Sequence, residues 1–192
     1  MASKPPVAVY DACVLYPFHL HNVLIQCAFD DLVEARWIDD IHDEWMRNLA
    51  ANTPALPIER LIATRDRMKA VLPEADVTNY RPLVAGLKLP DPDDRHVLAT
   101  AIASKASVIV TWNLKDFPAR DLFPHGVTSQ SPDDFLIDLH AAFPDALISS
   151  INSARRNLRK TTPSVEAFVD ALQQGGLKNF PGVLHRNIAG LK

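Results

Sequence analysis

The chain has 192 residues, of which 47% are hydrophobic and 22% charged, and its formal net charge is -3. These values fit one domain of ordinary size with an appendage, and they exclude a bulk polycation. A role in nucleic-acid binding would therefore need local basic patches and a metal ion to offset the acidic residues.

The cysteine content and the N-terminus predict where the protein works. Cys13 and Cys27 form no CxxC or His/Cys cluster, so we expect no disulfide framework and no structural zinc, and we predict a cytosolic protein. The N-terminus lacks the pattern of a signal peptide, and no apolar stretch approaches the roughly 20 residues of a membrane span.

The first predicted element is a buried strand at residues 6–11, where an apolar β-branched run stops at Asp11. Further along, the hydrophobic spacing predicts helices at 21–35, 41–52, 57–72 and 91–106, and strands at 74–79, 107–113 and 125–130. The alternation of strands and helices is typical of a parallel sheet covered by helices on both faces.

The pattern changes after about residue 130. Three helical segments follow at 131–143, 145–160 and 164–177, with no strand between them. Ser131 and Ser164 are candidate N-caps. We therefore predict an α/β domain at residues 1–138 and a helical C-terminal extension at 139–192.

Three acids stand together in DPDDRHVLATA, at the start of the helix predicted at residues 91–106. Asp91 can cap this helix, Pro92 fits its first turn, and Asp93 and Asp94 favour the positive end of the helix dipole. Capping alone can therefore account for these acids, and a functional role needs further residues.

Further polar residues follow the predicted strands. Asp11 ends the first strand, and the segment after the strongest strand supplies Thr111, Asn113 and Asp116. Ligands of open parallel sheets bind beyond the carboxyl ends of the strands, so these residues are expected at one edge. Glu44 lies at the border of the apolar stripe of its helix; its alternative role is that of a solvated acid paired with Arg47.

Several carboxylates that converge on one point repel one another unless a cation neutralises them. Mg²⁺ and Mn²⁺ prefer carboxylate and water oxygens. Such ions can hold the attacking and leaving oxygens of a phosphodiester. The acidic residues therefore suggest metal-assisted phosphoryl chemistry.

Four segments, taken in order, resemble the motifs of the PIN-domain family, and most closely those of VapC-type toxins of bacterial toxin–antitoxin systems. These segments are VYDACVLYP, the Glu of HDEWMRNL, DPDDRHVLATAIA and VIVTWNLKDFP, within a similarity that covers roughly residues 6–138. The resemblance implies a three-layer α/β/α fold with a central parallel sheet. It also implies endoribonuclease activity with Mg²⁺ or Mn²⁺, a homodimer, and inhibition by a cognate antitoxin, with tRNA or rRNA as the expected class of substrate.

The resemblance assigns the metal-binding and catalytic acids to Asp11, Glu44, Asp94 and Asp116, with Thr111 and Asn113 in support. One departure is that Asn113 stands where many relatives have an acid. This residue can bind water but brings no charge, which leaves open whether Asp116 reaches the metal directly or through water.

Two residues near these acids are assigned other roles from the sequence. His96 is expected to point away from Asp94 in a surface or packing role, and Cys13 is expected to be a small buried hydrophobe.

Two other functions stay open at this point. A PIN-like fold without catalysis would only bind RNA or a protein, and Asn113 is its best support. A phospho-acceptor signalling domain also gathers acids at strand ends, with Lys115 as its candidate lysine, but the helix of Glu44 and the long tail argue against it.

Overall fold

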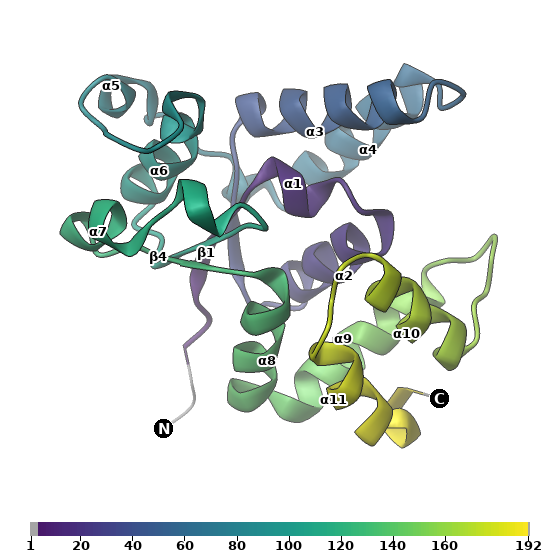
Figure 1. Ribbon diagram of the computed structural model, residues 1–192. Coiled ribbons are helices and arrows are strands. Elements are labelled where there is room, and N and C mark those ends of the chain that lie inside the picture. Colours follow the sequence, from purple (N-terminus) through teal and green to yellow (C-terminus); the bar gives the residue numbers. More distant parts are fainter. Residues whose placement is uncertain (1–3, 192) are drawn as a thin grey trace.

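The computed structural model describes residues 4–191. Its centre is a sheet of four parallel strands in the order β2-β1-β3-β4. Figure 1 shows the strands in the middle of the molecule with helices around them. The strands are β1 (Val7–Tyr10), β2 (Glu34–Arg36), β3 (Val108–Val110) and β4 (Thr128–Gln130).

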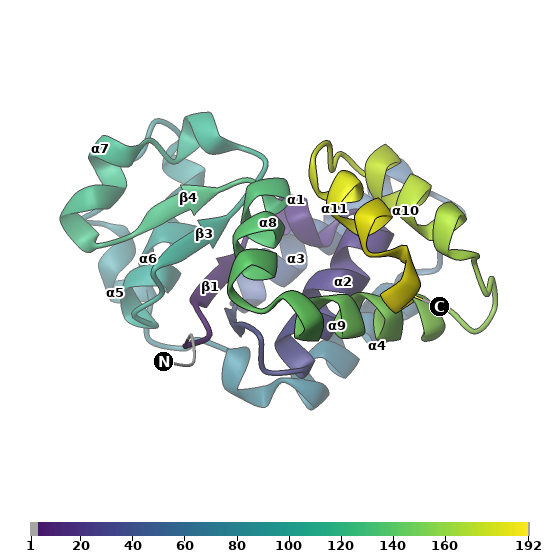
Figure 2. The ribbon, with the colours of Figure 1, turned by 90° about the horizontal axis from the view of Figure 1, so that it is seen from below.

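Helices cover both faces of the sheet. α6 packs against β1 and β3, and α2 and α8 lie on the opposite face, as seen in Figure 2. The predicted three-layer α/β/α fold with a parallel sheet and C-terminal helices is therefore confirmed. The α-helices are α1 (Ala12–Leu15), α2 (Phe18–Phe29), α3 (Asp39–Asn52), α4 (Ile58–Val71), α5 (Arg81–Val84), α6 (Arg95–Ala103), α7 (Ala119–Leu122), α8 (Pro132–Ala142), α9 (Pro144–Arg156), α10 (Val165–Gln174) and α11 (Phe180–Arg186). Short 3-10 turns are η1 (Pro73–Ala75), η2 (Pro92–Asp94), η3 (Leu114–Asp116), η4 (Phe123–His125) and η5 (Ile188–Leu191).

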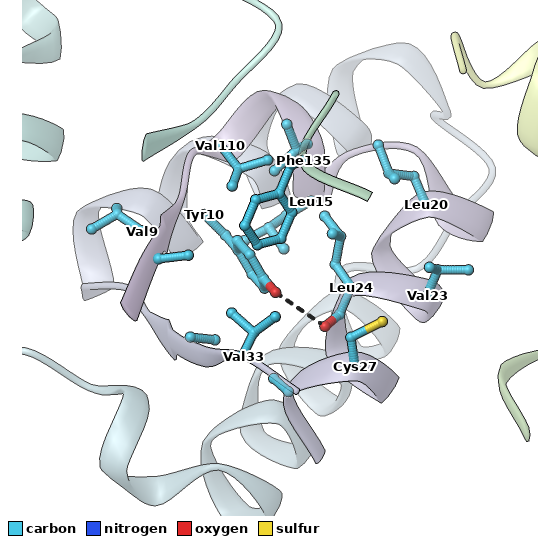
Figure 3. Close-up of a cluster of buried hydrophobic side chains, with 14 of the residues drawn as sticks. Val9, Tyr10, Leu15, Leu20, Val23, Leu24, Cys27, Val33, Val110 and Phe135 are labelled. Atoms are coloured by element: carbon cyan, nitrogen blue, oxygen red, sulfur yellow. Dashed lines mark hydrogen bonds between the residues drawn. The ribbon is translucent and has the colours of Figure 1, made fainter. Parts of the chain in front are cut away.

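Tyr10 marks the centre of the core between the sheet and the helices. Its ring meets Phe135 of α8 edge to face at 6.4 Å, and its hydroxyl donates a 3.3 Å hydrogen bond to the carbonyl of Leu24 in α2. Figure 3 shows this ring among buried aliphatic side chains. Tyr10 is wholly buried, so its hydroxyl needs this partner, and the bond fixes α2 over the end of β1.

The C-terminal helices pack on the same core. α9 runs against α2, and α11 contacts α8. A polar stripe on α2 accompanies the first contact, where Asn22 donates to the carbonyl of Ala154 at 2.7 Å and Ser150 donates to Asp30 at 2.6 Å. Asn157 adds a bond to Gln26 at 2.9 Å, so positions 22, 26 and 30 face α9 at helical spacing.

A buried carboxylate fixes the last helix. Asp133 is 5% exposed and accepts hydrogen bonds from the backbone N–H groups of Lys178, Asn179 and Phe180 at 2.9–3.2 Å. Three donors at the start of α11 are satisfied in this way. α8 is continuous from Pro132 to Ala142, and the predicted boundary after residue 138 stays a prediction.

The second strand lies elsewhere than predicted. β2 is Glu34–Arg36, within and just beyond the segment predicted as the end of a helix, because α2 stops at Phe29 and Asp31 takes the left-handed conformation with φ 59°. The strand predicted at 74–79 is wrong, since that segment begins in η1 and makes only a bridge between Asp76 and Trp37. Within residues 4–191, no helix is both long and apolar enough to cross a bilayer.

Candidate active site

Asp11 lies where β1 passes into α1, and three donors hold its carboxylate. Oδ1 accepts from the N–H of Ala12 at 2.7 Å, which caps α1. Oδ2 accepts from the hydroxyl of Thr111 at 2.6 Å and from the thiol of Cys13 at 3.1 Å. The carboxylate is 3% exposed, so this charge is buried and relies on these bonds for its solvation.

Thr111 connects Asp11 to the loop that follows β3. Its N–H donates to the carbonyl of Gln130 at 2.9 Å, which anchors the residue beside β4. Its hydroxyl accepts from the N–H of Asn113 at 3.0 Å while it donates to Asp11. Asn113 is exposed, and Asp116 at the end of η3 is half-buried. The Thr111 hydroxyl thus orients Asp11 and also stabilises the turn that carries Asp116.

Asp94 stands at the junction of η2 and α6. Asp91 caps this start by accepting from the N–H of Asp93 at 2.9 Å, and Pro92 occupies the first turn, as predicted. Asp94 makes no capping bond of its own and is half-buried. Its carboxylate is therefore free for another role.

Glu44 comes from α3, whose inner face is formed by buried Ile41 and Trp45. The Glu44 side chain is 33% exposed, at the border of that face. Its nearest basic group is the imidazole of His96, with 3.9 Å between Nε2 and Oε2.

The charges of these acids act on one another. Burial raises the pKa of Asp94 to about 7, and the charges of Asp11, Asp91, Asp116 and Glu44 add to this shift. Burial also raises the pKa of Glu44, with a further contribution from Asp11. Carboxylates from four distant segments of the chain thus lie within electrostatic reach of Asp94.

The chemistry of this donor set fits a divalent cation. Among residues 4–191, neither a lysine nor an arginine forms a salt bridge with Asp11, Asp94 or Asp116. In the same part of the chain, no three acidic, histidine or cysteine side chains are gathered closely enough to share one ion as they stand. A hard cation would therefore have to draw oxygens inward from several elements, and it would relieve their repulsion in doing so.

Two neighbours of the acids differ from their predicted roles. The ring of His96 faces Glu44 of α3, a contact that the sequence did not indicate. Cys13 is no simple hydrophobe, because its sulfur also accepts from the N–H of Trp112 at 3.2 Å and lies 3.3 Å from the Thr111 hydroxyl. Burial, with the charge of Asp11 next, raises the pKa of this thiol, so it stays protonated and can donate. In the sequence, only the position of Cys13, two residues after Asp11, indicates these contacts.

The C-terminal extension also reaches the β3 loop. Gly176 has φ 109°, and a Cβ at this position would lie 3.2 Å from the indole of Trp112. The turn after α10 therefore rests on the residue that follows Thr111. This contact could not be predicted from the sequence, because Trp112 and Gly176 are more than sixty positions apart.

Comparison with known proteins agrees with the fold. A model of the PIN domain matches residues 7–115, more than half of the chain, and the chain belongs to the PIN-domain family. A second model, the VapC50 C-terminal domain, matches residues 132–186 and covers most of the C-terminal helices. Together the two matches identify a PIN protein of the VapC type.

One curated relative is "Putative ribonuclease VapC50" of Mycobacterium tuberculosis (strain ATCC 25618 / H37Rv), 56% identical over 45 residues. The match spans 23% of this chain and only 27% of the relative's length. No solved structure matched the chain.

Proposed function

We propose that the protein is a metal-dependent endoribonuclease that hydrolyses RNA phosphodiester bonds. The observation that carries this proposal is that Asp11, Glu44 and Asp116 lie near enough to Asp94 for their charges to raise its pKa. Family membership and the name of the VapC50 relative support the same activity.

The residues have distinct roles in this proposal. Asp11 and Asp94 would hold a divalent ion, and Asp116 would complete its shell directly or through water. Glu44 would bind a second ion or orient the attacking water. Thr111 keeps the Asp11 carboxylate in one orientation through the 2.6 Å hydrogen bond, and Asn113 supports the site with an uncharged amide.

When bound, Mg²⁺ or Mn²⁺ would lower the pKa of a coordinated water and polarise the phosphodiester. The acids would orient the attacking water, and no histidine or lysine is required as the base. Because water attacks and not the ribose 2′-OH, the products carry 5′-phosphate and 3′-hydroxyl ends.

In the cell, we propose, the protein is the toxin of a type II toxin–antitoxin system. It acts in the cytoplasm as a homodimer, on tRNA or rRNA, and a cognate antitoxin inhibits it. The resemblance to VapC-type proteins supports these partners.

The test is cleavage of total RNA by purified protein with and without Mg²⁺ or Mn²⁺, followed by sequencing of the cut ends. Asp11→Asn should abolish the metal-dependent cleavage and leave the fold intact. Asp43→Asn is the matched control, because Asp43 is exposed on α3 next to Glu44. Undiminished cleavage by Asp11→Asn would refute the assignment.

A second candidate is a PIN-like module that binds RNA or a protein without cutting. The exposed, uncharged Asn113 favours it. The same assay separates the two, since this module would bind Mn²⁺ weakly or not at all and would leave every RNA intact.

A further inference from the structure

His96 presents one ring nitrogen to the acids in a defined orientation. Its Nδ1 lies 2.6 Å from the carbonyl oxygen of Asp93. A carbonyl oxygen only accepts hydrogen bonds, so Nδ1 carries the proton. In the neutral ring, Nε2 then has a free electron pair.

That electron pair has no partner among the described residues. Nε2 is buried and makes no hydrogen bond, although the imidazole side chain as a whole is 17% exposed. Glu44 Oε2, at 3.9 Å, is too far for a hydrogen bond. A buried acceptor that faces a carboxylate is unfavourable unless a proton or a metal cation lies between the two groups.

The surroundings of the ring are those of a metal ligand. Metal-bound histidines commonly donate their other ring N–H to a backbone carbonyl, which fixes the tautomer and the ring plane. Two ligands at about 2.0–2.2 Å from one ion can lie up to roughly 4.4 Å apart. The separation of 3.9 Å between Nε2 and Glu44 Oε2 is within this limit.

We propose that His96 is a nitrogen ligand of the metal site and makes it select Mn²⁺ over Mg²⁺. This inference rests on the proposed function. An imidazole adds a ligand without adding negative charge to acids that already repel one another. Nitrogen ligands favour first-row transition ions, whereas Mg²⁺ demands oxygen ligands and keeps its waters.

The test is pulsed electron paramagnetic resonance of Mn²⁺ added to the metal-free protein of 192 residues. Directly bound imidazole should give a ¹⁴N modulation that His96→Gln abolishes. In the same variant the affinity for Mn²⁺ should fall about tenfold or more, and that for Mg²⁺, measured by competition, about twofold or less. His125→Gln should change neither value, because this exposed residue precedes β4 at the opposite edge of the sheet.

The outcomes separate this inference from the proposed function. Mn²⁺ that binds the wild type, is lost in Asp11→Asn and shows no ¹⁴N modulation would overturn the role of His96 and leave the nuclease proposal standing. A wild type that binds no Mn²⁺ would overturn both. The wild-type spectrum alone decides the ligand if His96→Gln fails to fold.

Discussion

The hydroxyl of Thr111 donates a 2.6 Å hydrogen bond to Oδ2 of Asp11, although the residues are 100 positions apart in the chain. Parallel pairing of β1 with β3 makes this contact possible, because it sets Tyr10 beside Val110 and brings the next residue of each strand together. The carboxylate at the centre of the proposed site is thus positioned by the sheet itself.

Thr111→Val should both destabilise the fold and weaken the site. The substitution leaves the buried Asp11 without one donor and the N–H of Asn113 without its acceptor, at a cost of about 1.5–3 kcal/mol. Urea unfolding measures the stability. In the cleavage assay, activity should fall tenfold or more, as expected when one charged group of a site is misaligned. Thr111→Ser should retain most of both properties.

Thr128→Val is the control for this change, since it removes an exposed hydroxyl bond to the carbonyl of Ser107 on the same sheet. Its effect should stay within about 0.5 kcal/mol, as for most surface substitutions. Equal destabilisation by the two valine variants would contradict the special role of Thr111.

The stability of the metal-free protein should depend on pH through Asp94. This carboxyl has a pKa of about 7 in the fold against an ordinary value of 3.8. The folded state therefore binds the proton more tightly, and the contribution of Asp94 to stability is greatest below the ordinary pKa and is lost as the pH rises through about 7.

Asp94→Asn should remove part of this dependence. At about pH 8, without metal, it should stabilise the protein by on the order of 1 kcal/mol, a value reduced because solvent screens this half-buried group. Urea unfolding in a chelator, at about pH 5 and about pH 8, measures the difference. The same loss of stability toward high pH in both proteins would contradict the role of Asp94.

Asp133→Ala should release the last helices. The variant leaves the N–H groups of Lys178, Asn179 and Phe180 without their acceptor, and we expect a loss of about 2–4 kcal/mol. Hydrogen exchange should rise first in α10 and α11. Asp138→Ala, an exposed position on the same helix, should be nearly neutral, and equal exchange in the two variants would refute the role of Asp133.

Gly176→Ala should disturb Trp112. The left-handed backbone costs a side chain about 1 kcal/mol, and here the new Cβ would also meet the indole at 3.2 Å. The indole N–H resonance of Trp112 should shift. Gly126→Ala is the matched control, because Gly126 has φ 70° and open space around its Cβ position. An unchanged Trp112 resonance in Gly176→Ala would show that the C-terminal turn does not constrain the β3 loop.

Much of the fold could be predicted because its signals are local. The runs that form β1 and β3 are apolar and bounded by turns, and Asp91, Ser131 and Ser164 cap helices where predicted. β2 could not be found in this way. It is only three residues long, its two ends are polar, and its pairing with β1 supplies the stability that its sequence lacks.

The acids of the candidate site could be predicted from the sequence, but the residues around them could not. Asp11, Glu44, Asp94 and Asp116 could be chosen because a family pattern and strand ends point to them. Cys13 and His96 could not, since their contacts depend on where Trp112 and Glu44 come to lie in the folded chain. Such roles are determined by tertiary packing, which hydrophobic spacing does not encode.

The polar stripe of α2 has an evolutionary consequence. The side chains of these three positions form hydrogen bonds with residues in α9 or directly after it. The pairs are Asn22 with Ala154, Gln26 with Asn157, and Asp30 with Ser150. A homologous PIN-domain protein without such a tail would expose these three positions to water and would have no reason to keep hydrogen-bonding side chains there. Their identity should therefore serve as a sequence marker that separates tailed members from tailless ones.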